Sequence, residues 1–506
     1  MKSIQLTRTK SSEPGLNGRN CPIKGDHWLI RAWFCRTSAR KGTLPRLVAY
    51  DDASTQPLLC SATVRFRSVK LSLMKFENSV AAENPFKRNE RLILLILAAV
   101  QFTTIVDFMI VMPLGPQLMR TLQIGPTKFG LIVSSYTFAA GIAGLAASSI
   151  VDRFARRSTF VFFYAGFLLG TLACALAPNY LALILARVVT GAFGGILGGM
   201  TMAIIGDVFP EQRRGRATGS LMTGFALASV AGVPFGLVVG TNYGWHMPFI
   251  ALAIAGLPIL LLIPFALPRL DSHIGKQHLR PIRSLIETFS NTNHLNAFAL
   301  IVTLMIGSFT VFPYISPYLV HNVGMSEQQL PLVYVAGGLL TLFAAPMIGR
   351  LADRYGKLIV YRLIAPISAT LLVVITHLPA VHVSIAIGVF GALMVSNVGR
   401  MVAAMAMVTS CVEPNRRGAF LSANSSVQHV ASGFGAYVGG LIVTQSADGR
   451  LEHFGTVGWI AAASTLISLW VAGRVRILVQ PTVSANESTA EISLPAAAKM
   501  TAEATS

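Results

Sequence analysis

From about residue 91 onward, long apolar runs alternate with short polar breaks. A helix needs about 20 apolar residues to cross about 30 Å of hydrocarbon. Twelve such runs follow one another as six, a polar stretch at 268–294, and six more. We therefore predict an all-α membrane protein with twelve transmembrane helices in two pseudo-symmetric six-helix bundles, at 88–267 and 295–476. The runs begin near Leu92, Phe129, Thr159, Tyr180, Thr218, Met247, Leu295, Leu330, Ile359, His382, Ala419 and Val457.

Composition agrees with a chain that lies in lipid. Of the 506 residues 53% are hydrophobic and 12% are charged, with a mean hydropathy of +0.60, whereas soluble domains carry roughly 25% charged residues. The formal net charge of +20 does not indicate nucleic-acid binding, which needs a contiguous basic footprint. Residues 1–73 hold thirteen Lys/Arg against four Asp/Glu, and most other basic residues lie in short clusters between the apolar runs. We expect a lipid bilayer and no nucleic acid as partner.

The N-terminal 75 residues differ from the rest because they show no helical periodicity and no apolar run long enough for a signal peptide. Two interpretations stay open. The segment is an organellar transit peptide, or translation begins at Met74. Either one predicts disorder at 1–75, and we expect the same of the tail at 477–506. The five cysteines show no ligand spacing, so we predict neither a disulfide framework nor a metal site.

Basic residues concentrate in alternate loops, the pattern that places those loops in the cytoplasm. The other loops hold only Arg120, Lys128 and Arg450. Both termini are therefore predicted to be cytoplasmic. The cytoplasmic groups are Lys87, Arg88 and Arg91; Arg153, Arg156 and Arg157; Arg213, Arg214 and Arg216; the linker; Arg350, Arg354 and Lys357; and Arg416 and Arg417.

The two halves repeat each other. The segment IVDRFARR after the second run returns as LADRYGK after the eighth, with Asp152 and Asp353 separated by 353 − 152 = 201 residues. The segment EQRRG returns as PNRRG, with Gly215 and Gly418 separated by 418 − 215 = 203 residues. Two parallel copies suit a carrier, in which one half rocks against the other around a site near the midplane.

At this point the chain resembles the major facilitator superfamily, over about residues 88–476. The signature of that family after the second span reads Gly-x-Leu-Ala-Asp-Arg-x-Gly-Arg-Lys. The second-half copy matches it at Gly349, Leu351, Ala352, Asp353, Arg354, Gly356 and Lys357. The first-half copy has Asp152, Arg153, Arg156 and Arg157, but Ser148 and Ala155 stand where glycines are usual.

These signature loops are interpreted as latches of the cytoplasmic gate. An Asp at a helix end beside basic residues can pair with charges or a helix N-terminus of the neighbouring bundle. Such a contact forms in one state and breaks in the other. The alternative is a plain basic turn of the kind that any cytoplasmic loop carries.

Two further segments resemble motifs of the same family. Arg187 in the fourth run, with Gly191 four residues later, resembles the motif linked to proton coupling; the alternative is an arginine that snorkels from a helix end. In the fifth run, the small residues Gly224, Gly232, Gly236 and Gly240 with Pro234 resemble the antiporter motif of exporters, most closely in the arabinose-efflux-permease-like branch of the drug–proton antiporters. Pro234 removes a backbone hydrogen bond and is predicted to bend the helix there, and Val233 separates the glycine and proline that are usually adjacent. A glycine stripe is also ordinary helix packing in membranes.

Asp107 lies in the first run, six residues before Pro113, with apolar neighbours on both sides. Burial disfavours the charged form of a carboxylate unless it is paired, which suits a group that binds and releases protons. The alternative is a permanent ion pair, for example with Arg187. Arg400 in the tenth run is a second buried arginine that could meet an anionic substrate or balance Asp107. Asn397 and Gln101 are further candidate cavity residues or helix–helix hydrogen-bonding groups.

The sequence holds no phosphate-binding Gly-x-x-x-x-Gly-Lys-Ser/Thr loop, so the proton gradient is the expected energy source. We predict a proton-coupled exporter of a small drug-like compound or sugar in the inner (plasma) membrane. It is expected to act as a monomer, without a cofactor and without enzymatic activity. Two alternatives stay open: a symporter that takes up a sugar or an organic anion, and a membrane sensor or scaffold that transports nothing.

Overall fold

A computed structural model describes residues 88–150, 154–268, 281–413 and 417–477. The predicted leader, Asp152, Arg153 and all but the first residue of the predicted tail lie outside these ranges. The described residues thus cover both predicted bundles except for two short loops, and they also cover the end of the linker.

The first half begins with α2 (Arg88–Ile110) and its short continuation α3 (Gly115–Thr121). The helices α4 (Pro126–Ile150), α5 (Arg156–Ala175) and α6 (Tyr180–Val208) follow. A segmented fifth rod consists of α7 (Glu211–Leu227), the π-helical turn η2 (Ala228–Gly232) and α8 (Val233–Tyr243). The half ends with α9 (Met247–Ala266).

The predicted linker contains a helix that the sequence pattern did not indicate, α10 (Pro281–Ser290). The second half then repeats the plan of the first: α11 (Thr292–Phe309), α12 (Phe312–His321), the 3-10 turn η3 (Glu327–Gln329), α13 (Leu330–Tyr355), α14 (Lys357–Thr376), α15 (Val383–Ser410), α16 (Arg417–Ile442) and α17 (Phe454–Ala472). A small antiparallel hairpin, β1 (Thr444–Gln445) with β2 (Leu451–Glu452), joins the last two helices, and Thr444 pairs with Glu452.

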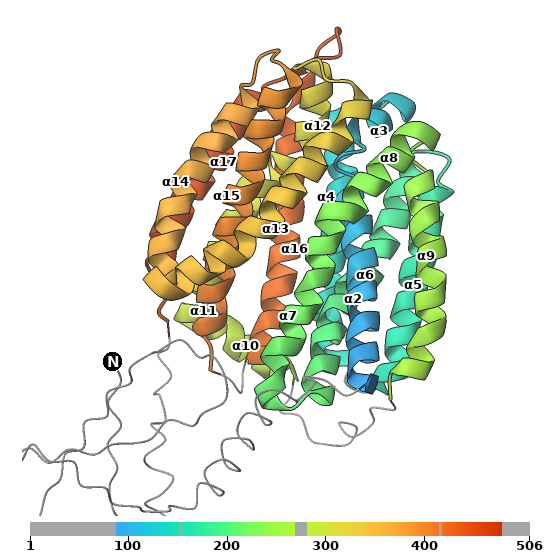
Figure 1. Cartoon of the computed structure of the whole chain (residues 1–506), viewed down its shortest axis with the longest axis vertical. Coiled ribbons are helices and arrows are strands. Elements are labelled where there is room, and N and C mark those ends of the chain that lie inside the picture. The colour runs from blue at the N-terminus through green and yellow to red at the C-terminus, as the bar shows by residue number, and fades with distance from the viewer. Residues whose placement is uncertain (1–87, 151–153, 269–280, 414–416, 478–506) are drawn as a thin grey trace, which may run out of the picture. The chain divides into compact units, whose positions relative to one another are not determined.

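Ten segments of the described chain are long and apolar enough to cross a membrane. The two remaining predicted spans are the segmented rod α7–η2–α8, which has three arginines in its first two turns, and α16, which contains four serines. Figure 1 shows that both run alongside the other long helices. The predicted all-α membrane fold is confirmed.

Large apolar side chains point outward along these helices. Phe265 is 87% exposed, Phe343 is 73% exposed and Leu261 is 68% exposed. Contiguous exposed apolar surface of this kind is rare on soluble monomers, and it is the expected lipid-facing surface of a membrane bundle. The cores, in contrast, are filled by buried aliphatic and aromatic side chains within each half.

Helices of the same half and of different halves approach closely at small residues. In the first half, α6 packs on α4 at Gly191 and Gly195, where an added Cβ would meet the backbone carbonyls of Tyr136 and Ala140. Across the halves, α4 packs on α16, where Gly141 faces the backbone of α16. In membranes such small residues let van der Waals contacts and backbone proximity hold helices together.

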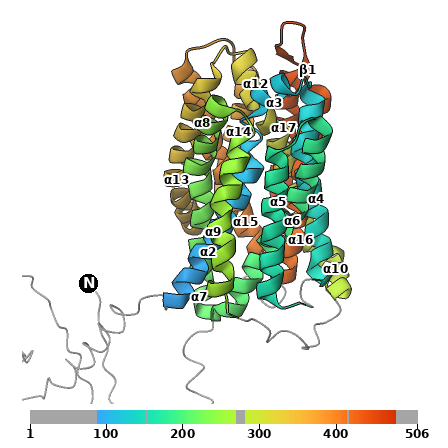
Figure 2. The same cartoon turned by 90° about the vertical axis from the view of Figure 1, so that its right-hand side faces the viewer.

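At the end that holds α3 and α12, at the top of Figures 1 and 2, polar side chains join the two halves. There Arg120 of α3 forms an ion pair with Glu327 of η3. The Thr127 hydroxyl of α4 donates to the backbone oxygen of Gly440 on α16 at 2.7 Å. Below this, Gly338 of α13 lies against the backbone of η2. We call this the closed end.

The opposite end holds α10 (Figure 2). Its two described ion pairs each join helices of one half. Arg156 at the start of α5 pairs with Asp207 of α6, and Arg213 of α7 pairs with Glu90 of α2, at 2.9 Å. These two ion pairs join helices of the first half, whereas the ion pair at the closed end joins one half to the other.

The predicted glycine stripe lies against α2. Cβ atoms at Gly232 and Gly236 would meet Val106 and Ile110 of that helix, and a Cβ at Gly240 would meet Leu114 in the turn that follows it. Pro234 stands in the first turn of α8, directly after η2. In the π turn the Val233 N–H donates to the Ala228 oxygen, five residues back. Because proline cannot donate a backbone hydrogen bond, this irregular turn is where the ladder of the fifth rod is interrupted.

Two glycines of α6 provide a test of this packing. Gly195→Ala should destabilise the protein by about 1–3 kcal/mol, since the new methyl group meets a backbone carbonyl that cannot rotate away. Gly198→Ala, in the same helix with open space around it, should be neutral or stabilising by about 0.5–1 kcal/mol because alanine favours helix. Thermal unfolding of the purified variants measures both. Equal effects at the two positions would contradict the packing.

Candidate functional site

Asp107 and Arg187 form an ion pair inside the first half. Arg187 Nη1 lies 2.8 Å from Asp107 Oδ2 and 3.3 Å from the backbone oxygen of Asp107. Side-chain exposure is 0% for Asp107 and 1% for Arg187. The pair joins α2 to α6, and it is the partnership that the sequence offered as the alternative to a free proton carrier.

The helix carrying Asp107 ends earlier than the apolar run suggested. α2 stops at Ile110, three residues after Asp107, and a turn at 111–114 leads into α3. Pro113 in this turn cannot donate a helical hydrogen bond, which accounts for the break. Asp107 thus lies in the last turn of α2 and not at its middle, beside a place where the helix direction is free to change.

Other side chains complete the surroundings of the pair. The Thr171 hydroxyl of α5 lies 3.2 Å from Asp107 Oδ1, and the Arg187 guanidinium lies 4.4 Å from the centre of the Tyr136 ring of α4. Nε of Arg187 is buried and has no acceptor in the described structure. Four helices therefore converge on one neutral charge pair, held by a hydrogen bond and a cation–π contact.

Because the two charges lie on α2 and α6, protonation of Asp107 would alter the electrostatic balance between these helices. As an ion pair the two side chains carry no net charge. A proton that binds to Asp107 cancels its charge and leaves Arg187 as an isolated cation in apolar surroundings, which is costly. Proton uptake therefore favours a rearrangement in which Arg187 finds another partner or water.

Phe108, the neighbour of Asp107, connects the pair to the second half. Its ring stacks on Tyr136 at 5.4 Å between centroids and on Phe309 of α11 at 5.9 Å. All three side chains are buried or half-buried. The ion pair thus lies next to the contact between the halves.

A second polar cluster lies inside the second half, around Arg400 of α15. Arg400 Nη1 donates to the Thr465 hydroxyl of α17 at 2.7 Å, and Nη2 donates to Asn397 Oδ1 at 2.9 Å and to the Ser308 hydroxyl of α11 at 3.2 Å. Arg400 is fully buried. Asn397, predicted as a cavity residue, is half-buried, and Arg400 contacts this cluster and not Asp107.

Gln101 lies on α2 and is half-buried. The residues that the sequence analysis did not single out are the hydroxyl-bearing partners Thr171, Ser308 and Thr465. The signal that could have found them is weak, because a threonine or serine in an apolar helix usually bonds to its own backbone, as Thr171 also does to the Phe167 oxygen at 3.0 Å.

The signature-loop residues lie at the α10 end. Asp353 and Arg354 form the exposed last turn of α13, where the Arg354 guanidinium lies 5.3 Å from the Tyr355 ring. Lys357 opens α14 and donates to the backbone oxygen of Ala406 at 3.2 Å. Arg157 is half-buried at the start of α5. Asp353 has no ion-pair partner among the described residues, so the described second-half loop is not latched across the halves.

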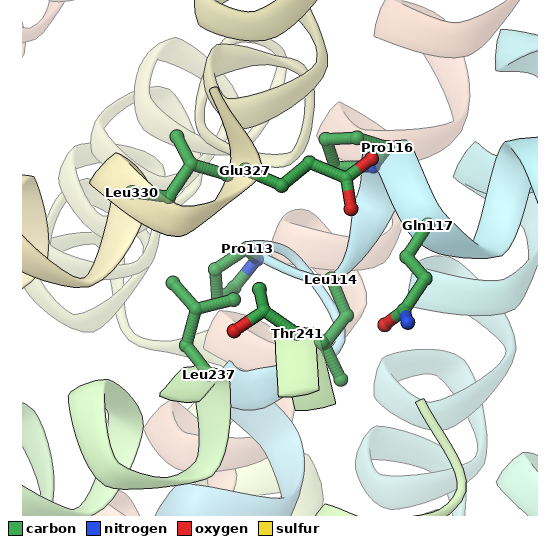
Figure 3. Close-up of a pocket in the computed structure, with 8 residues that line it drawn as sticks. All are labelled: Pro113, Leu114, Pro116, Gln117, Leu237, Thr241, Glu327 and Leu330. Carbon is green, nitrogen blue, oxygen red and sulfur yellow. The ribbon is translucent and has the colours of Figure 1, made fainter. Parts of the chain in front are cut away.

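A small crevice lies at the closed end (Figure 3). It is lined by residues of the α2–α3 turn, α8 and the start of α13, including Pro113, Leu237 and Leu330. Its one carboxylate, Glu327, already pairs with Arg120. This crevice is the seam between the halves at their closed end, and it offers no free charged group.

Removing one charge of the buried pair should be worse than removing both. Asp107→Leu leaves Arg187 unpaired and should lower the free energy of unfolding by about 3–5 kcal/mol. Asp107→Leu with Arg187→Leu removes the unpaired charge and should recover most of that loss. Unfolding of the wild type, both single variants and the double variant in detergent measures the coupling. Additive losses would mean that the pair is not energetically coupled.

Comparison with known proteins identifies the fold. The family model of the Major Facilitator Superfamily matches residues 97–402 of this chain. A second, overlapping match covers residues 297–502. The structure resembles a D-xylose–proton symporter, with a TM-score of 0.62 and 15% identity over 77% of this chain and 97% of that one. It also resembles the xylose transporter XylE from E. coli in a partially occluded inward-open conformation, with a TM-score of 0.60 and 15% identity over 76% of this chain and 97% of that one.

A third similar structure is a bacterial homologue of the human lysosomal transporter Spinster, inward-facing and unoccupied. Its TM-score is 0.56 at 13% identity, over 77% of this chain and 95% of that one. The likeness to these solved structures concerns the fold, while the family match covers most of the chain. The two repeated halves, the buried polar clusters and this match together show that the chain belongs to the Major Facilitator Superfamily of secondary transporters.

Proposed function

We propose that this transporter exports a small molecule in exchange for protons, and that Asp107 is the proton-binding group. The observation that carries the proposal is the fully buried Asp107–Arg187 pair between α2 and α6. The ionised form of Asp107 is stabilised by Arg187. The protonated form becomes similar in free energy only if Arg187 can then bind another partner. The pair lies beside the turn that follows α2 and beside the contact between the halves, where such a change is transmitted.

Alternating access requires that one end closes while the other opens. The closed end is held by the Arg120–Glu327 ion pair and by the hydrogen bond from Thr127 to Gly440. The distribution of Lys and Arg predicts that this end faces outward from the cell and that the α10 end faces the cytoplasm. On this assignment the structure represents an inward-facing state, and the signature loops with Asp152 and Asp353 would form the latch of the opposite state.

The direction of transport is proposed from the fifth rod. Its segment resembles the antiporter motif of exporters, and its glycines let α8 lie directly on α2 near Asp107. The π turn η2 also touches α13 of the second half at Gly338. A movement of α2 on proton binding would therefore reach the contact between the halves through this rod, which supports coupling of the proton to closure of the outer end.

The direct test is a proton-exchange assay with the full chain in inverted vesicles. An acid-inside pH gradient is followed with a pH-sensitive dye while sugars, antibiotics and organic anions are added one at a time. A substrate should dissipate the gradient with the wild type and not with Asp107→Asn, since the amide cannot bind the transported proton. Glu452→Gln, an exposed hairpin residue, serves as the matched control and should behave as the wild type.

Two results would contradict the proposal. One is a compound that dissipates the gradient equally well with folded Asp107→Asn. The other is a folded wild type that responds to no compound, which would favour the sensor or scaffold alternative.

A second candidate is proton-coupled uptake. It is favoured by the likeness to a solved D-xylose–proton symporter. The two functions differ in the sign of proton movement. When substrate is added to right-side-out vesicles without an imposed gradient, antiport acidifies the medium and symport makes it more alkaline.

The ion pair at the closed end should control opening. Arg120→Glu places two carboxylates opposite each other and should weaken closure, which slows net transport severalfold. The exchanged variant, Arg120→Glu with Glu327→Arg, restores opposite charges and should recover most of the rate. Initial transport rates in vesicles measure this. If the exchanged variant is as slow as the single one, the ion pair is not part of the outer gate.

A further inference from the structure

Arg400 is a buried cation without a counter-charge. It is fully buried, and each of its three described hydrogen bonds goes to a neutral group. Its Nε is also buried and has no acceptor among the described residues. A cation in such surroundings normally pairs with an anion, because burying an isolated charge is among the most expensive events in a protein interior.

The second half holds no acidic residue that could provide this charge from within the membrane. Between residues 295 and 476 every acid belongs to a turn, a loop, the hairpin or the last turn of a helix: Glu327, Asp353, Glu413, Asp448 and Glu452. In the first half, Asp107 is engaged by Arg187. No acidic side chain of the second half is placed to supply the missing negative charge, so an anion bound from solution is the natural source of it.

The internal repeat shows where that charge belongs. Asp107 of α2 corresponds to Ser308 of α11, since 308 − 107 = 201 is the separation of the two signature aspartates. Phe108 and Phe309 correspond at the same separation, and their rings stack on each other across the halves. Arg187 reaches Asp107 in the first half, and Arg400 reaches Ser308 in the second. The second half thus has a serine where the first half has the carboxylate. Its arginine does not occupy the repeat position of Arg187, since 400 − 187 = 213, so Arg400 reaches Ser308 from a different turn of its helix.

We infer that the Arg400 cluster is the anion-binding part of the transport site, and that the substrate carries a carboxylate which takes the place held by Asp107 in the other half. The inference rests on the proposed transport of a small molecule. A planar carboxylate matches the donor fork of a guanidinium. One negative charge neutralises Arg400, whereas a phosphate dianion would leave an excess. The neighbouring hydroxyl and amide groups add neutral hydrogen-bonding partners.

Asn397 is the most accessible polar side chain of the cluster. Asn397 and Phe309 are half-buried, whereas Arg400 and Ser308 behind them are buried. Phe309 lies at the contact with Phe108 of the first half. A carboxylate that enters between the halves therefore meets Asn397 first and displaces its hydrogen bond to Arg400. Rearrangement at the aromatic contact then connects this event to the Asp107 pair.

The test supplies the missing carboxylate within the chain. Ser308→Asp should pair with Arg400, while Ser308→Asn is the neutral control of nearly the same size. In a chloride-free buffer, the unfolding midpoint of the purified full-length Ser308→Asp variant should exceed that of Ser308→Asn by at least about 2 °C. The same midpoint is then measured with acetate, pyruvate or benzoate, with acetamide and benzamide as neutral counterparts, and with inorganic phosphate and chloride.

At least one carboxylate should raise the midpoint of the wild type and of Ser308→Asn, and none should raise that of Ser308→Asp, whose site is already filled. The inference is overturned if Ser308→Asp is no more stable than Ser308→Asn, if no carboxylate stabilises the wild type, or if the amides, phosphate or chloride stabilise it as well as any carboxylate does. The measurement uses no proton gradient, so its result is independent of whether Asp107 couples transport to protons.

Discussion

The free-energy cost of burying a charge among apolar side chains determines which partners the buried polar residues of this transporter need. Asp107 and Arg187 are both inaccessible to solvent, and each tolerates burial because the other is 2.8 Å away. If one of the two side chains loses its charge, the other becomes an unpaired buried charge that needs a new partner or water. Since the two residues lie on different helices, we propose that protonation of Asp107 changes the relative positions of α2 and α6. The glycine contacts of α8 with α2 and the stack of Phe108 on Phe309 carry that change to the rest of the fold.

The two halves share one arrangement of helices, but they compensate the charge of their buried arginine in different ways. The first half contains both members of its ion pair, whereas the second contains the arginine and offers hydroxyl and amide groups in place of the acid. In a carrier built from two copies, this asymmetry would assign proton binding and substrate binding to different halves. According to our two proposals, one half holds the proton site and the other holds a site that the substrate completes.

The fold could be read from the sequence, because lipid imposes a simple length and polarity rule on each span. The start of α6 at Tyr180 and the start of α9 at Met247 are as predicted. The helix α10 was not predicted, since a short amphipathic helix has no such rule to reveal it. The site was only partly readable. Charged residues in apolar runs are conspicuous, so Asp107, Arg187 and Arg400 could be named in advance.

Which groups these charges contact depends on the rotation of each helix about its axis, and sequence spacing does not fix that rotation between helices. Thr171, Ser308 and Thr465 come from three different helices and look like ordinary small polar residues in the sequence. The π turn before Pro234 was likewise expected only as a bend. Its hydrogen bond from Val233 to Ala228 depends on packing against neighbouring helices, including α13 of the other half.

The central claim is that Asp107 itself binds and releases the coupled proton. Infrared difference spectra of the purified full-length protein, recorded between acidic and alkaline buffer, observe the carbonyl stretch of a protonated carboxylic acid directly. The account predicts a band that appears on acidification in the wild type and is absent from Asp107→Asn, with the remaining spectrum unchanged. A wild-type spectrum identical to that of Asp107→Asn would contradict it, because Asp107 would then stay ionised as a permanent partner of Arg187.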